Sequence, residues 1–284
     1  MIEVSHLTKK YGSTAAVSDL SFKVEKGEIY GFLGPNGAGK TTTISLLSTL
    51  LLPTKGEILI DGQQLTRQRP DLKRKISVIT QEYSMRQDMN MDEIMEYQGR
   101  LYFMPRKQIK ERTEELLEFC DLLKFRKRTV RKLSGGMKRK LMVCRALLTD
   151  PEILLLDEPT AGMDALSRRQ MWNLLRKLNE KNLTILLTTH YMEEAQSLCN
   201  RVALMDHGKL EEVSTPSALI ESLGAYAVDE MTADGTQNHY FHTRQEAIRY
   251  LEELTGQASL RETTLEDRSE ERRVGKECRS RWSP

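Results

Sequence analysis

The sequence predicts an α/β fold with a mainly parallel β-sheet core, antiparallel N-terminal strands, a helical insertion and a small C-terminal α/β unit. Short apolar runs typical of buried strands alternate with helical patterns, as expected for a parallel sheet covered on both faces. A glycine-rich loop joins one of these strands to a helix. Beyond about residue 223 the alternation gives way to a hairpin pattern and one helix.

The expected strands fall into two groups, separated by a long helical stretch. The first group is IEVSHL, LSFKV, GEIYGFLG, EILID and ISVIT. From about residue 92 to residue 148 apolar residues recur at helical spacing, with a break expected near Pro105. Strands return at EILLLD, LTILLTT and RVALMDHGKL, with helical stretches between them. The long helical stretch is therefore an insertion in the sheet architecture.

Length and composition are those of a soluble globular protein. The 284 residues suffice for one large domain, or for a large domain with a small one. Apolar residues make up 39% of the chain, and the longest apolar run, residues 44–52, is far short of the roughly 20 residues of a membrane-spanning helix. Four scattered cysteines predict free thiols in a reducing cytosol, and a net charge of +2 indicates no particular partner.

The sharpest local signal is GPNGAGKT, which fits the pattern G-x-x-x-x-G-K-[ST] between a strand and a helix. The glycines let the backbone curl so that successive N–H groups point at phosphate oxygens, and the helix N-terminus adds a favourable field. Lys40 would then bridge the β- and γ-phosphates, and the Thr41 hydroxyl would be a ligand of Mg²⁺. A plain glycine turn before a helix is the alternative. The predicted ATP-binding residues of this loop are Gly34, Pro35, Asn36, Gly37, Ala38, Gly39, Lys40, Thr41 and Thr42.

A second signal is the acidic pair in EILLLDEP. The buried strand delivers Asp157 to its C-terminal end, where open α/β sheets bind ligands. There Asp157 is predicted to hold Mg²⁺, and the adjacent Glu158 is predicted to act as general base by polarising a water towards the γ-phosphate. Taken alone, such a pair is also compatible with a capped strand exit. Because the same sequence also contains a phosphate-binding loop, the catalytic interpretation of the pair is favoured.

Residues 1 to about 222 resemble the ATP-binding subunit of ABC transporters, which is a P-loop NTPase. LSGGM, at residues 133–137, is similar to the family's signature sequence, usually L-S-G-G-Q, and opens a helix with another phosphate-binding N-terminus. The resemblance implies that Ser134, Gly135 and Gly136 engage ATP held by the opposite subunit of a head-to-tail dimer. Met137 departs from the usual glutamine, and SGGM-K-R resembles the branch that serves ABC-2 type exporters.

Four further positions match the family. The resemblance implies that Gln81, in VITQEY, touches Mg²⁺ and the attacking water, and that His190, in LLTTHYMEEA, contacts the γ-phosphate. Asp164, in AGMDALSRR, matches the loop that communicates across the dimer, although a methionine precedes it in place of the usual leucine. Tyr11, in KKYG, matches the aromatic residue that stacks on adenine. For Tyr11 an ordinary buried tyrosine is the alternative.

The resemblance also implies a function. The chain would be a cytoplasmic ATPase on the inner face of the cell membrane. It would dimerise around two Mg·ATP with a second copy of itself or with a homologous ATPase, and drive a separate permease, as an exporter, without a nucleic-acid partner. The helical insertion, about residues 83–148, would dock the permease through the methionine-rich EYSMRQDMNMDEIM, unless these methionines fill the core. A soluble ABC-type ATPase acting on ribosomes or DNA is one alternative, which a single cassette without long coiled coils disfavours. The second alternative is an interaction module that binds ATP without hydrolysing it, and the presence of Glu158 and His190 disfavours this alternative.

Residues 223–267 are predicted to form a small accessory unit, after a cassette that spans residues 1–222. AYAVDEMTADGTQNHYFHT predicts a hairpin that turns at Asp234-Gly235. Thr243 and Glu246 have the spacing of a capping box, which predicts that a helix begins there. A glycine at position 256 is expected to close this helix.

The end of the chain divides at Asp267. Thr264 and Asp267 repeat the capping-box spacing in TLED, which resembles the start of the last helix in related exporter ATPases. The apolar continuation of that helix is missing here, so the accessory unit is expected to be truncated. Residues 268–284 instead resemble the translation of a sequencing-library adapter, and they carry six basic and three acidic side chains. A genuine basic tail for lipid headgroups is the alternative.

Overall fold

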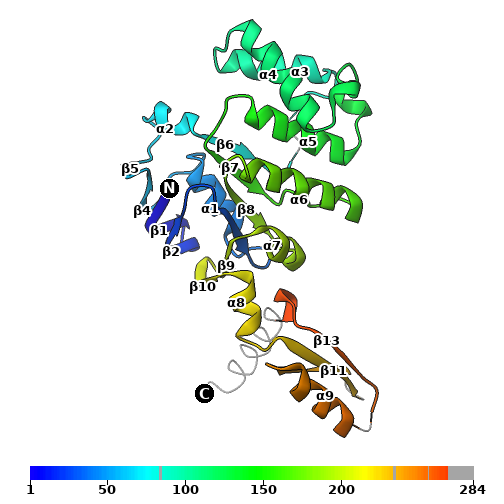
Figure 1. The fold of residues 1–284 in the computed structure, drawn as a ribbon. Helices are drawn as coiled ribbons and strands as arrows, with labels where there is room; N and C mark the ends of the chain where they lie inside the picture. Colours follow the sequence, from blue (N-terminus) through cyan, green and yellow to red (C-terminus); the bar gives the residue numbers. More distant parts are fainter. Residues whose placement is uncertain (83–84, 233–234, 255, 268–284) are drawn as a thin grey trace. The chain divides into compact units, whose positions relative to one another are not determined.

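The computed structural model describes residues 1–82, 85–232, 235–254 and 256–267 (Figure 1). The chain forms two compact units, of which the first comprises residues 1–190 and 203–212. The second comprises residues 191–202 together with the described residues from 213 to 267. The domain boundary at residue 222 remains a proposal. The predicted tail, residues 268–284, lies outside the described residues.

An antiparallel sheet in the first unit contains the N-terminal strands. It has the order β2-β1-β4-β5 and consists of β1 (Ile2–Tyr11), β2 (Thr14–Val24), β4 (Lys55–Ile60) and β5 (Gln63–Gln64). Ile2, Val4 and Leu7 of β1 are buried, and exposed or half-buried side chains alternate with the first two of them. This alternation is typical of an antiparallel sheet with one face on the core.

The central sheet has six strands in the order β10-β9-β3-β8-β7-β6. Four of them run parallel, namely β3 (Ile29–Leu33), β8 (Thr184–Thr189), β7 (Ile153–Asp157) and β6 (Ile76–Ile79), while β9 (Arg201–Asp206) and β10 (Lys209–Ser214) continue the sheet. All residues of β3, β7 and β8 are buried, because helices such as α1 (Lys40–Leu47) cover this sheet. The predicted α/β fold with a mainly parallel sheet is confirmed.

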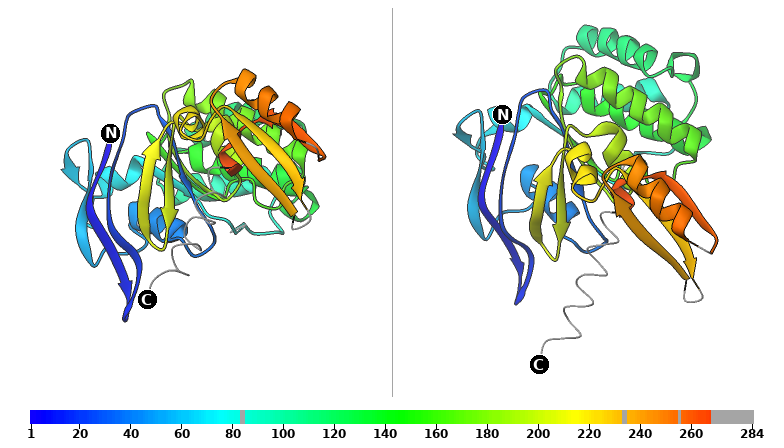
Figure 2. Two further views of the ribbon diagram at one scale, coloured as in Figure 1. Left: turned by 90° about the horizontal axis from the view of Figure 1, so that it is seen from below. Right: turned by 60° about the horizontal axis from the view of Figure 1, so that its bottom comes forward.

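The helical insertion comprises α3 (Met91–Leu101), α4 (Arg106–Phe119) and α5 (Gly135–Leu147), with two short 3-10 turns between the last two. α3 begins at a capping box between Asn90 and Glu93 and ends before the predicted break, where Pro105 becomes the N-cap of α4. α5 lies beside α6 (Ala165–Asn179), as the two green helices in Figures 1 and 2 show. A short helix, α2 (Pro70–Arg74), precedes β6.

Three of the four methionines of the methionine-rich segment are buried, and the fourth, Met89, is half-buried. Met85, Met91 and Met95 are buried, so they offer no docking surface; residues 83 and 84 lie outside the described part of the chain. Exposed apolar side chains lie instead along and just beyond α3, at Tyr97, Leu101, Tyr102 and Phe103. None of the described helices combines the length and apolar character that crossing a bilayer requires.

The second unit is a three-stranded antiparallel sheet with helices. Its strand order is β12-β11-β13, and α9 packs on this sheet (Figure 2). The predicted hairpin is present, since Thr232 pairs with Gly235, whereas Asp234 lies outside the described residues. The elements are α7 (Met192–Leu198), α8 (Pro216–Glu221), β11 (Tyr226–Thr232), β12 (Gly235–Phe241), α9 (Arg244–Glu253) and β13 (Ala258–Glu262).

Helix α9 begins as predicted and ends differently. Thr243 and Glu246 form the capping box. The helix ends at Glu253, and the expected closing role of Gly256 is wrong, because Leu254 already leaves the helix in extended conformation (ψ 137°) and no left-handed glycine is needed.

A polar cluster ties the last described residues to the sheet of the second unit. The Asp267 carboxylate accepts hydrogen bonds from Arg261 Nη1 (2.8 Å) and Nη2 (2.6 Å), and from the backbone N–H of Thr264 (2.7 Å). Arg261 Nε donates to Asp229 on β11 (2.6 Å). The predicted pairing of Thr264 with Asp267 is therefore present, and Arg261 connects it to the central strand.

Replacing Arg261 by methionine is expected to destabilise the second unit. Burial of Asp267 raises its pKa, but hydrogen bonds from Arg261 and Thr264 outweigh this effect and hold the pKa below its usual value. A carboxylate with a lowered pKa stabilises the fold above the unfolded-state pKa of about 4, and this stabilisation is lost as the pH falls through the folded-state pKa. We expect Arg261→Met to reduce the free energy of unfolding by about 2 kcal/mol at pH 7.

Hydrogen exchange of peptides from β11 and β13 at pH 7 measures the local loss of stability in Arg261→Met. Urea unfolding between pH 7 and pH 3 measures the acid dependence, which the Arg261→Met variant should show less steeply than the wild type. Arg249→Met, on the exposed side of α9, is the control for loss of one positive charge. An unchanged acid dependence in Arg261→Met would contradict the assignment.

Candidate functional site

The glycine-rich loop has a backbone that only glycine accepts at key positions. Gly37 and Gly39 have φ values of +84° and +97°, in the left-handed region. A Cβ atom at Gly39 would lie 2.5 Å from the carbonyl oxygen of Ala16 on β2, and one at Gly34 would collide with the carbonyl of Met205 on β9. The loop is thus packed tightly between two sheets, which fixes the direction of its N–H groups.

Helix α1 starts directly after this loop, and no side chain caps its N-terminus. Its first N–H groups are therefore available for an anionic ligand. Lys40 Nζ donates to the carbonyl oxygens of Gly34 (2.7 Å) and Pro35 (3.0 Å). Burial lowers the pKa of Lys40, and the negative charges of Glu158 and Asp157 partly offset this. A cation thus lies between the loop and two acidic residues.

Asp157 and Thr41 lie close together, as a metal site requires. Thr41 Oγ1 donates to Asp157 Oδ1 (3.1 Å), and Thr188 Oγ1 on β8 donates to the same oxygen (2.5 Å). Asp157 itself is 4% exposed. A hydroxyl and a carboxylate are hard oxygen ligands, and Mg²⁺ typically takes one or two such protein ligands with phosphates and waters. The residues present therefore fit a Mg²⁺ ion that arrives with a nucleotide.

Glu158 and His190 form a pair at the ends of two neighbouring strands. The Glu158 Oε1 atom lies 3.0 Å from His190 Nδ1. Glu158 has a φ of +47°, which is unusual for a residue with a side chain. Its N–H donates to the backbone oxygen (3.1 Å) and hydroxyl (3.0 Å) of Thr188. The structure brings together the predicted Lys40, Thr41, Asp157, Glu158 and His190.

Four other predicted residues form no hydrogen bond or ion pair with this cluster through their side chains, among the residues that the structure describes. Gln81 is exposed, and in the described part of the chain its side chain makes no hydrogen bond with Thr41 or Asp157. Tyr11, at the end of β1, is 49% exposed, so it is not the ordinary buried tyrosine. Ser134 is exposed and caps α5 by accepting from the N–H of Met137 (3.3 Å). Asp164 is exposed and caps α6.

A hollow of about 480 Å³ borders the N-terminus of α5. Ser134 and Gly136 line it together with Lys124, Lys140 and Lys177. Asp121 also lines the hollow, 3.6 Å from Lys140, but the three lysines outnumber it, which favours a negatively charged ligand on this surface.

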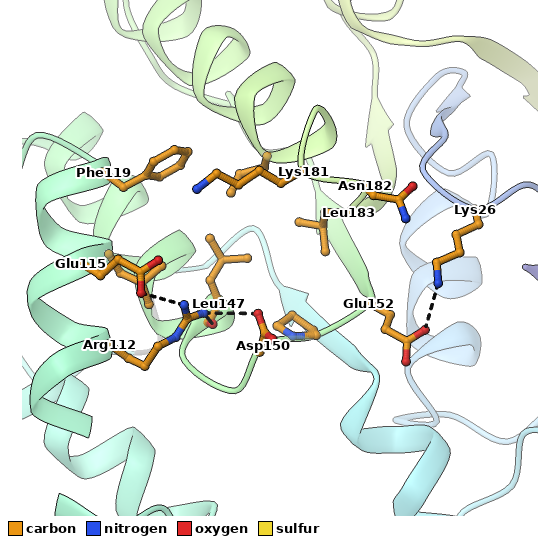
Figure 3. A pocket seen from close by; sticks show the side chains of 13 residues that line it. Lys26, Arg112, Glu115, Phe119, Leu147, Asp150, Glu152, Lys181, Asn182 and Leu183 are labelled. Carbon is orange, nitrogen blue, oxygen red and sulfur yellow. Dashed lines mark hydrogen bonds and ion pairs between the residues drawn. The ribbon is translucent and has the colours of Figure 1, made fainter. Parts of the chain in front are cut away.

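A second hollow, of about 310 Å³, lies at the opposite ends of the parallel strands (Figure 3). Glu152 directly precedes β7, and Leu183 directly precedes β8, so the hollow faces the amino ends of the strands. Two of its cations form ion pairs within it, Arg112 with Asp150 (3.3 Å) and Lys26 with Glu152 (3.9 Å). Open α/β sheets bind ligands at the carboxyl ends of their strands, so this hollow is not the candidate site.

Sequence reasoning missed two residues of the site, Thr188 and Arg139. Arg139 is 2% exposed and donates to the backbone oxygens of residues around Gln81 and Glu158. Its signal was present in the helical period of α5, because Met142 and Val143, three and four residues further on, are buried on the same face. Thr188 stands in the apolar strand that ends just before His190 and carried no separate signal.

Comparisons with known proteins agree with one another. A family model described as ABC transporter matches residues 17–161. A linearmycin resistance ATP-binding protein of Bacillus subtilis is 34% identical over 90% of this chain and 82% of its own length. A Nod factor export ATP-binding protein of Paraburkholderia xenovorans is 41% identical over 78% of this chain and 73% of its own. A solved dimeric ATP-binding cassette with ADP and phosphate is 27% identical, with a TM-score of 0.67 over 76% of this chain and 98% of its own.

Proposed function

This chain belongs to the ABC transporter family as an ATP-binding subunit with ATPase activity, and we propose that it works as a pair of subunits that drives a separate membrane permease, in the direction of export. One observation carries the proposal: the acidic pair Asp157–Glu158 lies beside Lys40 and Thr41 at one site, whereas the exposed signature residue Ser134 belongs to a second surface. Because the two sets of residues lie on separate surfaces, we infer that a second subunit completes each ATP site.

In the proposed complex, Lys40 leaves the loop carbonyls and binds the β- and γ-phosphates. The loop of residues 34–42 surrounds the phosphates with the N–H groups of all its residues except Pro35, and the exposed ring of Tyr11 stacks on adenine. Mg²⁺ would be held by Thr41 and Asp157, with Gln81 turning towards it, and would neutralise phosphate charge when bound. These residues bind and orient the nucleotide before any bond changes.

Hydrolysis then requires a base at the γ-phosphate. Glu158 accepts a proton from the attacking water, and its carboxylate is kept in place by the nearby His190 ring at 3.0 Å. The oxygen of that water forms the new bond to phosphorus, and the bond from phosphorus to the β–γ bridging oxygen breaks. His190, which is partly exposed, also contacts the γ-phosphate.

Dimerisation supplies the rest of the site. Ser134, Gly135 and Gly136 of one subunit bind the γ-phosphate held by the other, and the lysines around the adjoining hollow attract its charge. Asp164, which is exposed at the start of α6, faces the partner. The solved cassette that resembles this chain is a dimer in a post-hydrolysis state, which supports the arrangement. ATP would favour the closed pair because it binds across the interface.

The names of the relatives support the proposed permease partner and the proposed direction of transport. Proteins named for Nod factor export and for linearmycin resistance suggest an exporter on the inner face of the membrane, with this chain in the cytoplasm. The exposed Tyr97, Leu101 and Phe103 on the helical insertion are the apolar surface that would meet the permease.

Capture by the permease tests this proposal. We expect a membrane permease encoded by a neighbouring gene to retain this chain on an affinity column after solubilisation in detergent, and Phe103→Ser with Leu101→Ser to weaken retention at least ~10-fold. Basal ATPase activity should stay unchanged in this double variant. Leu50→Ser is the matched control, because Leu50 is 59% exposed and lies outside the insertion. Full retention of the double variant would exclude this surface, and capture on ribosomes or DNA instead would exclude transport.

A further inference from the structure

Arg139 is a buried cation that donates hydrogen bonds to two functional loops. It lies on α5, five residues after Ser134, and is 2% exposed. Its Nε donates to the carbonyl of Pro159 (2.7 Å), and its Nη2 donates to the carbonyl of Glu158 (2.6 Å). Its Nη1 donates to the carbonyls of Thr80 (2.8 Å) and Gln81 (3.4 Å). One guanidinium thus joins the signature helix to the loops after β6 and β7.

The fork of the guanidinium explains why arginine suits this position. Arginine offers five N–H donors in a planar arrangement, so it can hold two loops at once, whereas lysine has one flexible charge centre. Burying a cation is unfavourable unless hydrogen bonds compensate, and here carbonyl oxygens from both loops do so. The two loops, which follow the paired strands β6 and β7, are therefore also joined by a side chain that neither loop contains.

The backbone conformation of Glu158 depends on this arrangement. Its left-handed backbone (φ +47°) is strained for a residue with a Cβ atom. Such a conformation persists only where surrounding contacts determine it. Thr188 holds the Glu158 N–H on one side, and Arg139 holds the Glu158 carbonyl on the other. These two contacts hold the backbone from which the Glu158 carboxylate extends towards His190.

We propose that Arg139 is a positioning residue, through which the signature helix of each subunit sets the catalytic geometry of Glu158 and Gln81 in the same subunit. This inference rests on the proposed function, in which Ser134–Gly136 bind the partner's ATP. A subunit whose signature helix is docked on the partner's nucleotide would then have its own water-activating residues in place. Binding at one ATP site conditions hydrolysis at the other.

Single variants give the first test. Arg139→Met should lower kcat about 30-fold with a change in KM for ATP below about threefold, since misplacing a catalytic group slows the chemical step. Arg139→Lys, which keeps the charge without the fork, should lie between the methionine variant and the wild type. Lys138→Met removes a neighbouring charge from the same helix and should stay within about twofold of the wild type. Nucleotide binding and thermal unfolding establish that each variant is folded.

Mixed dimers separate an effect within one subunit from an effect on the partner. Two differently tagged copies carry Arg139→Met and Glu158→Gln either together in one subunit or one in each subunit. Single-turnover hydrolysis is measured after dimers are loaded with ATP, so that repeated cycling is not needed. If Arg139 acts on its own subunit's Glu158, the first dimer cleaves one ATP at the wild-type rate and the second is about 30-fold slower.

The other outcomes overturn the inference. The reverse order would mean that Arg139 serves the partner's ATP through the signature residues, and equal rates in the two dimers would mean that it only stabilises the fold. A loss mainly in ATP affinity for Arg139→Met would also contradict a positioning role. If the wild type forms no ATP-dependent dimer at all, the proposed function itself fails, which is a separate and recognisable result.

Discussion

Replacing Glu158 by glutamine is expected to lower ATP turnover at least ~100-fold while ATP binding is retained, because a general base contributes factors of this size. Glutamine keeps the shape of the side chain and can still pair with His190, but it cannot accept the proton of the attacking water. Its neighbours Asp157 and Lys40 remain in place to hold the nucleotide. The ATP-bound dimer should therefore accumulate, since hydrolysis no longer removes the γ-phosphate that joins its halves.

Size-exclusion chromatography with ATP and Mg²⁺ detects this dimer, and phosphate release measures turnover. Glu57→Gln, at an exposed position on β4, is the control for loss of one negative charge and should behave as the wild type. Wild-type turnover in Glu158→Gln would show that another group is the base. Slow turnover without a stable dimer would contradict the proposed arrangement of the signature residues instead.

Local backbone requirements explain how much of this fold and site is predictable from the sequence. Gly39 and Lys40 are specified by a left-handed turn and by a phosphate-facing helix start, both of which leave a fixed sequence pattern. The buried parallel strands β7 and β8 leave uninterrupted apolar runs. The capping boxes of α3 and α9 involve residues only three positions apart, and the one at Thr243 was predicted for that reason.

Contacts between distant segments were not predicted, because they depend on tertiary packing and leave no local sequence pattern. Arg139 is the middle one of three consecutive basic residues. The helical period places it on the buried face of α5, but its hydrogen bonds to the loops after β6 and β7 depend on how α5 packs against them. The methionine-rich segment had the composition of a docking groove, yet its burial depends on how α3 and α5 pack. β13 was not predicted, because ASLRE has too few apolar residues for a strand pattern and is held by pairing with β11.

Replacing Lys40 by methionine is expected to weaken ATP binding at least ~100-fold, because charge-assisted hydrogen bonds to phosphate are lost in a partly buried site. The loss is large for this chain because Asp157 and Glu158 lie close to Lys40 and act on its pKa. Without the lysine, two carboxylates face the triphosphate with less positive charge to balance them. Methionine is similar in length, so the loop need not collapse.

Equilibrium binding of a fluorescent ATP analogue measures this loss, with Lys55→Met, an exposed lysine on β4, as the matched control. The double variant Lys40→Met with Glu158→Gln decides between binding and chemistry. If Lys40 acts in binding, the double variant forms no ATP-trapped dimer, because the step that Glu158→Gln blocks is never reached. A trapped dimer in the double variant, or wild-type affinity in Lys40→Met, would instead place Lys40 in the chemical step alone.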